Sequence, residues 1–212
     1  MAKEFKKRLL SSLILIPLSI YFIIQGSVFF IFFLSLIFLV SAYEWLKMLK
    51  KNYFIKVFGL IFLLFSFYSA YFIREDLGLH FFLFILLICI FTDLGGYVFG
   101  KTFRGPKLTK ISPNKTYTGV LGSFLFSFIS GLIFMRFTRI DNLLDLEDLL
   151  IFLIILFISL ISQIGDLIIS YFKRKAKLKD TGKILPGHGG LLDRIDGLIF
   201  VIPTIYILNL IK

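Results

Sequence analysis

The segment from Ser170 to Asp196, SYFKRKAKLKDTGKILPGHGGLLDRID, holds the side chains best suited to chemistry, because it combines many Lys and Arg residues with Asp and Gly. Asp193 and Asp196 lie three residues apart near its end. One Asp at that place is often only a helix N-cap, but two carboxylates exceed what capping needs. Carboxylate oxygens beside cations that bind phosphate are typical of a Mg²⁺ site. Asp166, on the preceding apolar segment, can complete a two-metal arrangement.

Two further motifs add groups that suit a phosphate. The glycines of PGHGG at 186–190 permit positive φ and let backbone N–H groups approach an anion closely. His188 can contact a phosphate or relay a proton there. A lone His is usually structural, but one inside a Gly-rich basic loop acts on substrate about as often as not. The segment SPNKTYTG at 112–119 contributes Ser112, Lys115 and Thr116. Together these groups predict phosphoryl or nucleotidyl transfer, and the sequence has neither a Walker loop nor a G-x-G-x-x-G motif.

The composition places this chemistry in a membrane protein. The chain is 58% hydrophobic and 17% charged, with a mean hydropathy of +0.92, more apolar surface than a soluble domain of 212 residues could bury. The net charge of +11 lies between apolar segments, so we expect it to attract lipid headgroups or a phosphate-bearing substrate and not nucleic acid. The single Cys89 excludes an internal disulfide and a Cys-based metal site.

We predict an all-α polytopic membrane protein that forms a single domain over residues 1–212, with about seven spans. The predicted spans are 9–25, 27–46, 53–73, 79–99, 118–137, 149–171 and 197–211. A turn at Gln25-Gly26 is predicted to separate the first two spans, which otherwise form one long apolar run. With the N-terminus inside, 20 of the 24 Lys and Arg residues fall on the inner side, which favours an N-in, C-out orientation. The polar loops 100–117 and 172–196 would then share the cytoplasmic face.

Polar side chains within the spans follow one helical face. Ser159, Gln163, Asp166, Ser170 and Lys173 recur at helical spacing. They can form one wall of a cleft that opens to the cytoplasm, or a polar seam against another helix. We favour the cleft, because a seam does not require a carboxylate.

Other polar positions in the spans have simpler explanations. Asp93 and Tyr97 share a helix face with Lys101 and can line the same cleft. Glu44, three residues before Lys47, is interpreted as an interfacial acid that snorkels or pairs with that Lys. The small residues of the fifth span predict close helix packing; they are Gly119, Gly122, Ser123, Ser127, Ser130 and Gly131.

The 170–196 segment resembles the signature of the phosphatidate cytidylyltransferases, also called CDP-diglyceride synthetases. In this chain the signature is written S-x-x-K-R, four residues, then K-D-x-G-x-x-L-P-x-H-G-G-L-x-D-R-I-D. The resemblance includes Gly165-Asp166-Leu167, Asp93 to Tyr97 with Gly100-Lys101, and Ser112-Pro113-x-Lys115-Thr116. It covers about residues 90–200, with a weaker N-terminal likeness at Glu44. Thr118 and Gly197 depart from the family pattern, and the first half is shorter by about two spans.

The resemblance implies an enzyme of the bacterial-type inner membrane, with its active site facing the cytoplasm, that makes CDP-diacylglycerol and pyrophosphate from CTP and phosphatidic acid. It implies Mg²⁺, with one or two cations, held by Asp166, Asp193 and Asp196. These three acids and His188 are the implied catalytic residues. The implied substrate-binding residues are Lys173, Arg174, Lys179, Asp180, Arg194, Lys101, Lys115, Ser112 and Asp93. The expected partners are the two substrates and the lipid bilayer, with a homodimer left open.

Three alternatives remain at this point. The chain could be a CTP-dependent enzyme that acts on another lipid phosphate or on a polyprenol, which only a substrate panel would separate. It could be an ion-coupled transporter whose intramembrane acids bind cations, although the sequence lacks the internal repeats and paired broken helices that favour this class. It could also be a homologue that has lost turnover.

Overall fold

The computed structural model describes residues 2–49, 52–109, 111–112, 115–138, 148–185, 187 and 189–211. Regular structure in these residues is helical, apart from isolated bridges that join Lys107 to Thr116 and Leu185 to Gly189. The helices are α1 (Ala2–Gln25), α2 (Ser27–Met48), α3 (Tyr53–Asp76), α4 (Leu79–Thr102), α5 (Tyr117–Thr138), α7 (Asp148–Lys175), α8 (Leu192–Ile195) and α9 (Leu198–Ile211). The predicted all-α class is confirmed.

Five of these helices are long and apolar enough to cross a membrane, namely α2, α3, α4, α5 and α7. Two shorter apolar helical stretches, Ser11–Gln25 and Leu198–Ile211, coincide with the first and last predicted spans. Large apolar side chains such as Phe54 and Phe137 are more than four-fifths exposed, as expected for a surface that faces lipid. The chain is therefore a polytopic membrane protein.

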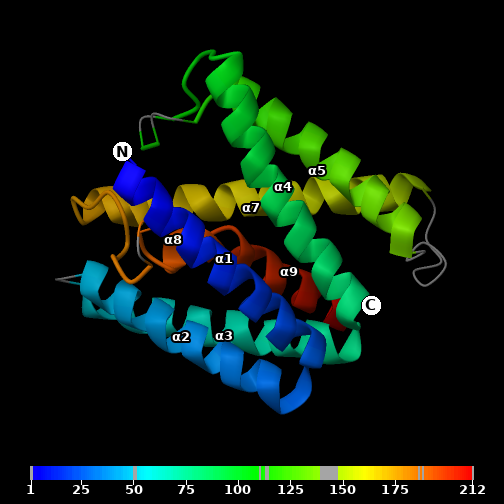
Figure 1. Ribbon diagram of the computed structural model, residues 1–212, viewed down its shortest axis with the longest axis horizontal. Helices are drawn as coiled ribbons and strands as arrows, with labels where there is room; N and C mark the ends of the chain where they lie inside the picture. The colour runs from blue at the N-terminus through cyan, green and yellow to red at the C-terminus, as the bar shows by residue number, and fades with distance from the viewer. Residues whose placement is uncertain are drawn as a thin grey trace.

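The turn at Gly26 separates α1 from α2, as predicted, and the end of α3 holds it in place. Gly26 has a φ of 65°, a region that favours glycine. The guanidinium of Arg74 donates at 2.8 Å to the carbonyl oxygens of Ile23 and Ile24, which α1 leaves unpaired at its C-terminus. Glu75 accepts a bond of 2.8 Å from the backbone N–H of Ser27. The first two helices therefore form a hairpin (Figure 1).

Helices α4 and α5 pack closely through glycine, as the small residues of the fifth span predict. A Cβ on Gly95 would collide with the carbonyl oxygen of Gly122, and a Cβ on Gly122 would collide with the Phe99 ring. The Ser123 hydroxyl, which is buried in this contact, donates to the carbonyl oxygen of Thr92 at 2.8 Å. The contact fixes the loop between the two helices relative to α7, which crosses behind both (Figure 1).

A side-chain hydrogen bond from α3 supports α9 at its proline. Pro203 has no N–H, so the carbonyl oxygen of Ile199, four residues earlier, loses its normal helical donor. The Ser66 hydroxyl donates to that oxygen at 2.9 Å, which satisfies a polar group that lipid could not. This contact anchors the start of α9 and with it Asp196.

The polar loops lie at one end of the molecule. The N-terminus, the segment after α4 and the segment after α7 are on the left of Figure 1. The turn at Gly26, the turn between α3 and α4 and the C-terminus lie toward the opposite end. The predicted grouping of the basic segments on one side is thus present in the fold.

Candidate active site

Asp166 and Asp196 meet where α7 passes the start of α9. A Cβ on Gly165 would lie 2.9 Å from the carbonyl oxygen of Asp196, so the glycine allows the Asp196 backbone to approach α7. The two carboxyl groups lie within hydrogen-bonding reach of each other. Asp196 is 6% exposed; burial raises its pKa well above the usual range, and the adjacent Asp166 raises the pKa further.

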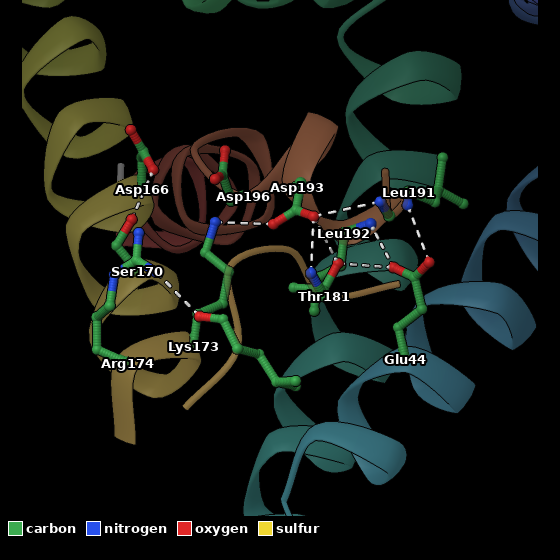
Figure 2. Close-up of polar contacts among 12 residues, drawn as sticks. Glu44, Asp166, Ser170, Lys173, Arg174, Thr181, Leu191, Leu192, Asp193 and Asp196 are labelled. Atoms are coloured by element: carbon green, nitrogen blue, oxygen red, sulfur yellow. Dashed lines mark hydrogen bonds and ion pairs between the residues drawn. The ribbon is translucent and has the colours of Figure 1, made fainter. Parts of the chain in front are cut away.

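Asp166 also has a cation at close range. Lys115, from the loop between α4 and α5, places its Nζ 2.5 Å from Asp166 Oδ2. The Ser170 hydroxyl, one helical turn along α7, donates to Asp166 Oδ1 at 3.2 Å (Figure 2). The predicted helical stripe thus brings Ser170 to Asp166, and the predicted phosphate-binding Lys115 reaches the same carboxylate.

A cavity of about 290 Å³ lies between α4, α5, α7 and the 103–116 loop. Four residues predicted to line a cleft, Asp93, Tyr97, Gln163 and Asp166, all contribute to its wall, and so do Ser112 and Lys115. Deeper along the stripe Ser159 is buried and accepts a hydrogen bond of 2.9 Å from Thr92. These predicted residues therefore line one cavity near Asp166, and the stripe becomes a polar seam at its deep end.

Asp193 organises the segment that follows α7. Asp193 Oδ1 forms an ion pair of 2.7 Å with Nζ of Lys173 on α7. The Asp193 side chain is only 9% exposed and the Lys173 side chain only 11%. Asp193 Oδ2 accepts from the backbone N–H of Thr181 at 2.8 Å, from the Thr181 hydroxyl at 3.0 Å and from the backbone N–H of Gly190 at 3.2 Å (Figure 2). The glycine-rich segment was predicted to bring backbone N–H groups close to an anion. In this structure that anion is the Asp193 carboxylate.

The glycines of that segment have the predicted backbone conformation. Gly187 and Gly189 have φ values of 78° and 88°, which lie in the left-handed region that favours glycine. The segment is closed by a pair of backbone hydrogen bonds between Leu185 and Gly189, at 3.0 and 3.2 Å. His188 lies outside the described residues, so its predicted role stays a prediction.

Glu44 requires a correction. The sequence suggested an interfacial acid that snorkels or pairs with Lys47, but Glu44 is 1% exposed and Lys47 instead contacts the Tyr43 hydroxyl at 3.4 Å. Glu44 reaches from α2 to the segment after α7 (Figure 2). It accepts from the Thr181 hydroxyl at 3.0 Å and from the backbone N–H groups of Leu191 and Leu192 at 3.1 and 2.9 Å. Both Glu44 and Thr181 were absent from the predicted site.

The remaining predicted cations lie around this core. Arg174 joins the two polar loops, because its guanidinium donates to the carbonyl oxygens of Ile111 at 3.4 Å and Leu178 at 3.0 Å. Lys101 is exposed and contacts the Tyr97 hydroxyl at 3.3 Å at the cavity wall. Exposed positions in the same region are Lys179, Asp180 and Arg194.

The three predicted metal ligands do not form one cluster. In the described part of the chain no group of three or more His, Cys, Asp or Glu side chains could hold a metal ion. Asp166 and Asp196 are adjacent, whereas both Asp193 oxygens are engaged by Lys173, Thr181 and Gly190. The adjacent pair fits Mg²⁺ by its donor chemistry, because this ion commonly takes one or two carboxylates and completes its shell with water and substrate phosphate.

Comparison with known proteins places the chain in a family. A model of the cytidylyltransferase family matches residues 52–211. The chain belongs to this family. The match begins after α2, so the helix that carries Glu44 lies outside it.

Individual relatives match over a shorter part of the chain. A phosphatidate cytidylyltransferase of Staphylococcus saprophyticus is 42% identical over 132 residues, which are 62% of this chain and 49% of the relative. One of Staphylococcus haemolyticus is 40% identical over 144 residues, 68% of this chain and 54% of the relative. One of Staphylococcus aureus is 41% identical over 132 residues, 62% of this chain and 49% of the relative. The chain spans about half the length of the curated relatives it matches.

Proposed function

We propose that the chain transfers the cytidylyl group of CTP to phosphatidic acid, forming CDP-diacylglycerol and pyrophosphate. The observation that carries this proposal is the meeting of the Asp166–Asp196 pair with Lys115 at a cavity within an apolar helix bundle. The names and sequence identities of the relatives support the choice of substrates. A lipid phosphate and a nucleoside triphosphate are both negatively charged, so their reaction requires cations where they meet.

In the proposed reaction a phosphate oxygen of phosphatidic acid attacks the α-phosphorus of CTP. The bond from that phosphorus to the oxygen bridging to the β-phosphorus breaks, and pyrophosphate leaves. Lys115 pairs with Asp166 and Lys173 pairs with Asp193, and we assign both cations to the phosphate groups. Both start paired with an acid, so each must exchange a carboxylate for a phosphate oxygen when substrate enters.

The acids have separate proposed roles. Asp166 and Asp196 would hold Mg²⁺, which when bound neutralises charge on the triphosphate. Asp193 shapes the segment after α7 through Thr181 and Gly190. Asp93 and Ser112 at the cavity wall are assigned to substrate binding.

More exposed positions complete the proposed set. Arg174 links both polar loops, and we assign it to the triphosphate together with Lys179. Lys101, Asp180 and Arg194 are assigned to the rim, where a substrate would enter. His188 is retained as a phosphate contact or proton relay.

We further propose seven spans with the N-terminus and the polar loops on the cytoplasmic side of a bacterial inner membrane. The grouping of the basic segments at one end of the fold supports this orientation. Lys183 is exposed in the segment after α7, and Asp76 is exposed at the end of α3. The segment after α7 and the turn that follows α3 lie toward opposite ends of the fold (Figure 1). Replacing each of these two residues by Cys, with Cys89 buried, should give labelling of position 183 only from the cytoplasmic side and of position 76 only from outside. The reverse pattern would invert the orientation. We also propose that residues 1–212 form a single domain.

The enzymatic proposal is tested with purified protein, Mg²⁺, CTP and vesicles that contain phosphatidic acid. We expect pyrophosphate release that requires all three and stops when a chelator is added. Asp166→Asn should abolish release, whereas Asp76→Asn, an exposed acid at the other end, should retain it. A panel with other lipid phosphates and polyprenol tests the substrate alternative. Absence of release with every lipid, from folded protein, would refute the proposed activity.

A further inference from the structure

Glu44 is the acid that links the N-terminal hairpin to the candidate active site. One oxygen, Oε2, accepts from both the Thr181 hydroxyl and the backbone N–H of Leu192, and the other, Oε1, accepts from the backbone N–H of Leu191. Leu191 and Leu192 stand immediately before Asp193, and Thr181 donates to Asp193 itself. Glu44 thus contacts the two residues immediately before Asp193 and the threonine that donates to Asp193.

The Thr181 hydroxyl connects the two acids directly. Its oxygen lies 3.0 Å from Glu44 Oε2 and 3.0 Å from Asp193 Oδ2. A hydroxyl has one proton to donate, so it can complete only one of these bonds at a time. The backbone N–H of Thr181 donates to Asp193 at 2.8 Å in either case. The orientation of this hydroxyl therefore depends on Glu44 and affects Asp193.

Two glycines make room for this contact. A Cβ on Gly182 would collide with Glu44 Oε1, and a Cβ on Gly190 would collide with the Thr181 hydroxyl and lie 2.8 Å from Glu44 Oε2. Neither glycine has a positive φ. Space for the carboxylate is thus the structural reason for glycine at these two positions.

We infer that Glu44 is a positioning residue for Asp193, and that the α1–α2 hairpin is therefore part of the working enzyme. The inference rests on the proposed function, because it assigns Glu44 to the same site. The donors of Thr181, Leu191 and Leu192 are neutral, so Glu44 contributes geometry and acceptor capacity to the segment. Its action on the reaction passes through Thr181 and the start of α8.

The decisive variant is Glu44→Gln, which keeps the shape but has only one acceptor atom. Whichever way the amide turns, its NH₂ group faces at least one N–H donor from Leu191 or Leu192. We expect kcat for pyrophosphate release to fall roughly 10- to 100-fold, with little change in the KM for CTP. Glu44→Asp keeps both oxygens on a shorter stem and should recover part of the loss.

A double-mutant cycle separates positioning from a general effect on folding. Thr181→Val removes the hydroxyl and keeps the shape, whereas Thr181→Ser keeps the hydroxyl and should be close to wild type. If Glu44 acts through Thr181, the Glu44→Gln/Thr181→Val pair loses much less activity than the product of the two single losses. Losses that multiply would overturn the proposed route.

The matched control is Glu75→Gln. Glu75 also accepts from a backbone N–H, that of Ser27, but at the opposite end of the hairpin. This variant should keep wild-type kcat. An equal fall in kcat for Glu75→Gln and Glu44→Gln would show a general effect of the hairpin and overturn the inference.

A second measurement keeps the inference separate from the proposed activity. Hydrogen exchange of the peptide that covers Leu191 and Leu192 should be faster in Glu44→Gln than in wild type, whether or not the protein turns over CTP. Inactive wild type with this exchange difference would refute the activity and keep the Glu44 contact. If the wild type is active and Glu44→Gln changes neither kcat nor the exchange rate, the inference about Glu44 is overturned while the proposed activity stands.

Discussion

Replacing Asp193 by asparagine should destabilise the protein as well as inactivate it, because of its ion pair with Lys173. The two side chains meet at 2.7 Å and are about one-tenth exposed. Removing one member of a buried ion pair leaves the other charge without a partner, at a cost of about 3–5 kcal/mol. Partial exposure reduces this, so we expect a loss of about 2–4 kcal/mol in the free energy of unfolding.

A second substitution, Lys173→Met, should recover most of that stability. The amide oxygen of the substituted side chain can take the place of Oδ2 and accept from Thr181 and Gly190, the bonds that Asp193 makes in the wild type. The NH₂ group then faces position 173, where it repels a Lys but not a Met. The double variant removes both charges of the pair, and replacing both members of such a pair is often nearly neutral. It should nevertheless be inactive, because the phosphate contact proposed for Lys173 is lost.

Thermal unfolding in detergent provides the assay, with Cys89 as the reporter. Cys89 is the only cysteine and is buried, so a thiol-reactive fluorophore reports its exposure on unfolding. For a chain of this length a loss of about 2–4 kcal/mol corresponds to a fall in Tm of about 5–15 °C. We expect this fall for Asp193→Asn, and a Tm near wild type for the double variant.

Two results would refute this reasoning. An unchanged Tm in Asp193→Asn would show that the ion pair does not stabilise the fold. A fall in the Tm of the double variant equal to the sum of the falls in the two single variants would show that Lys173 and Asp193 act independently. Pyrophosphate release at the wild-type rate by either variant would remove this pair from the proposed site.

Two further predictions concern the cavity and the helix contact beside it. Lys115→Met should raise the KM for CTP and lower kcat by about 10-fold or more, because Asp166 loses its 2.5 Å partner and the phosphates lose a cation; Lys115→Arg, assayed in parallel, should retain part of the activity. Gly122→Leu should lower the Tm strongly, because its side chain would enter the space of Phe99, whereas Leu121→Ala on the exposed face of α5 should change the Tm little. Wild-type kinetics in the first case, or equal Tm values in the second, would contradict these assignments.

Much of the fold was predictable because apolar length and charge placement are local properties of the sequence. The predicted spans overlap the observed helices, and the predicted turn at Gly26 separates α1 from α2. The sequence does not reveal what holds this turn in place, because Arg74, which donates to the last carbonyl oxygens of α1, lies about 50 positions away. Regular periodicity likewise placed Gln163 and Asp166 on a common cavity wall, since helical spacing is fixed by backbone geometry.

The arrangement of the acids was predictable only in part. Spacing along the chain puts Asp193 and Asp196 near one another, but it does not tell which of them meets Asp166. The short helix α8 separates the two side chains, so that Asp196 meets Asp166 whereas Asp193 meets Lys173 and Thr181. A predicted cluster of three ligands is therefore a pair of adjacent acids with a separately held third acid.

Glu44 shows why the local pattern failed at one position. An acid at the end of an apolar helix, with a Lys three residues later, has an adequate local partner, and that partner would be favoured if both side chains were in water. Inside the bundle pairing with Lys47 is no longer favoured, because a buried carboxylate must have both oxygens satisfied by hydrogen bonds. Three donors that converge from residues 137 to 148 positions later satisfy them. The sequence signal for this contact was glycine at 182 and 190, which becomes interpretable only once the carboxylate that needs the space is known.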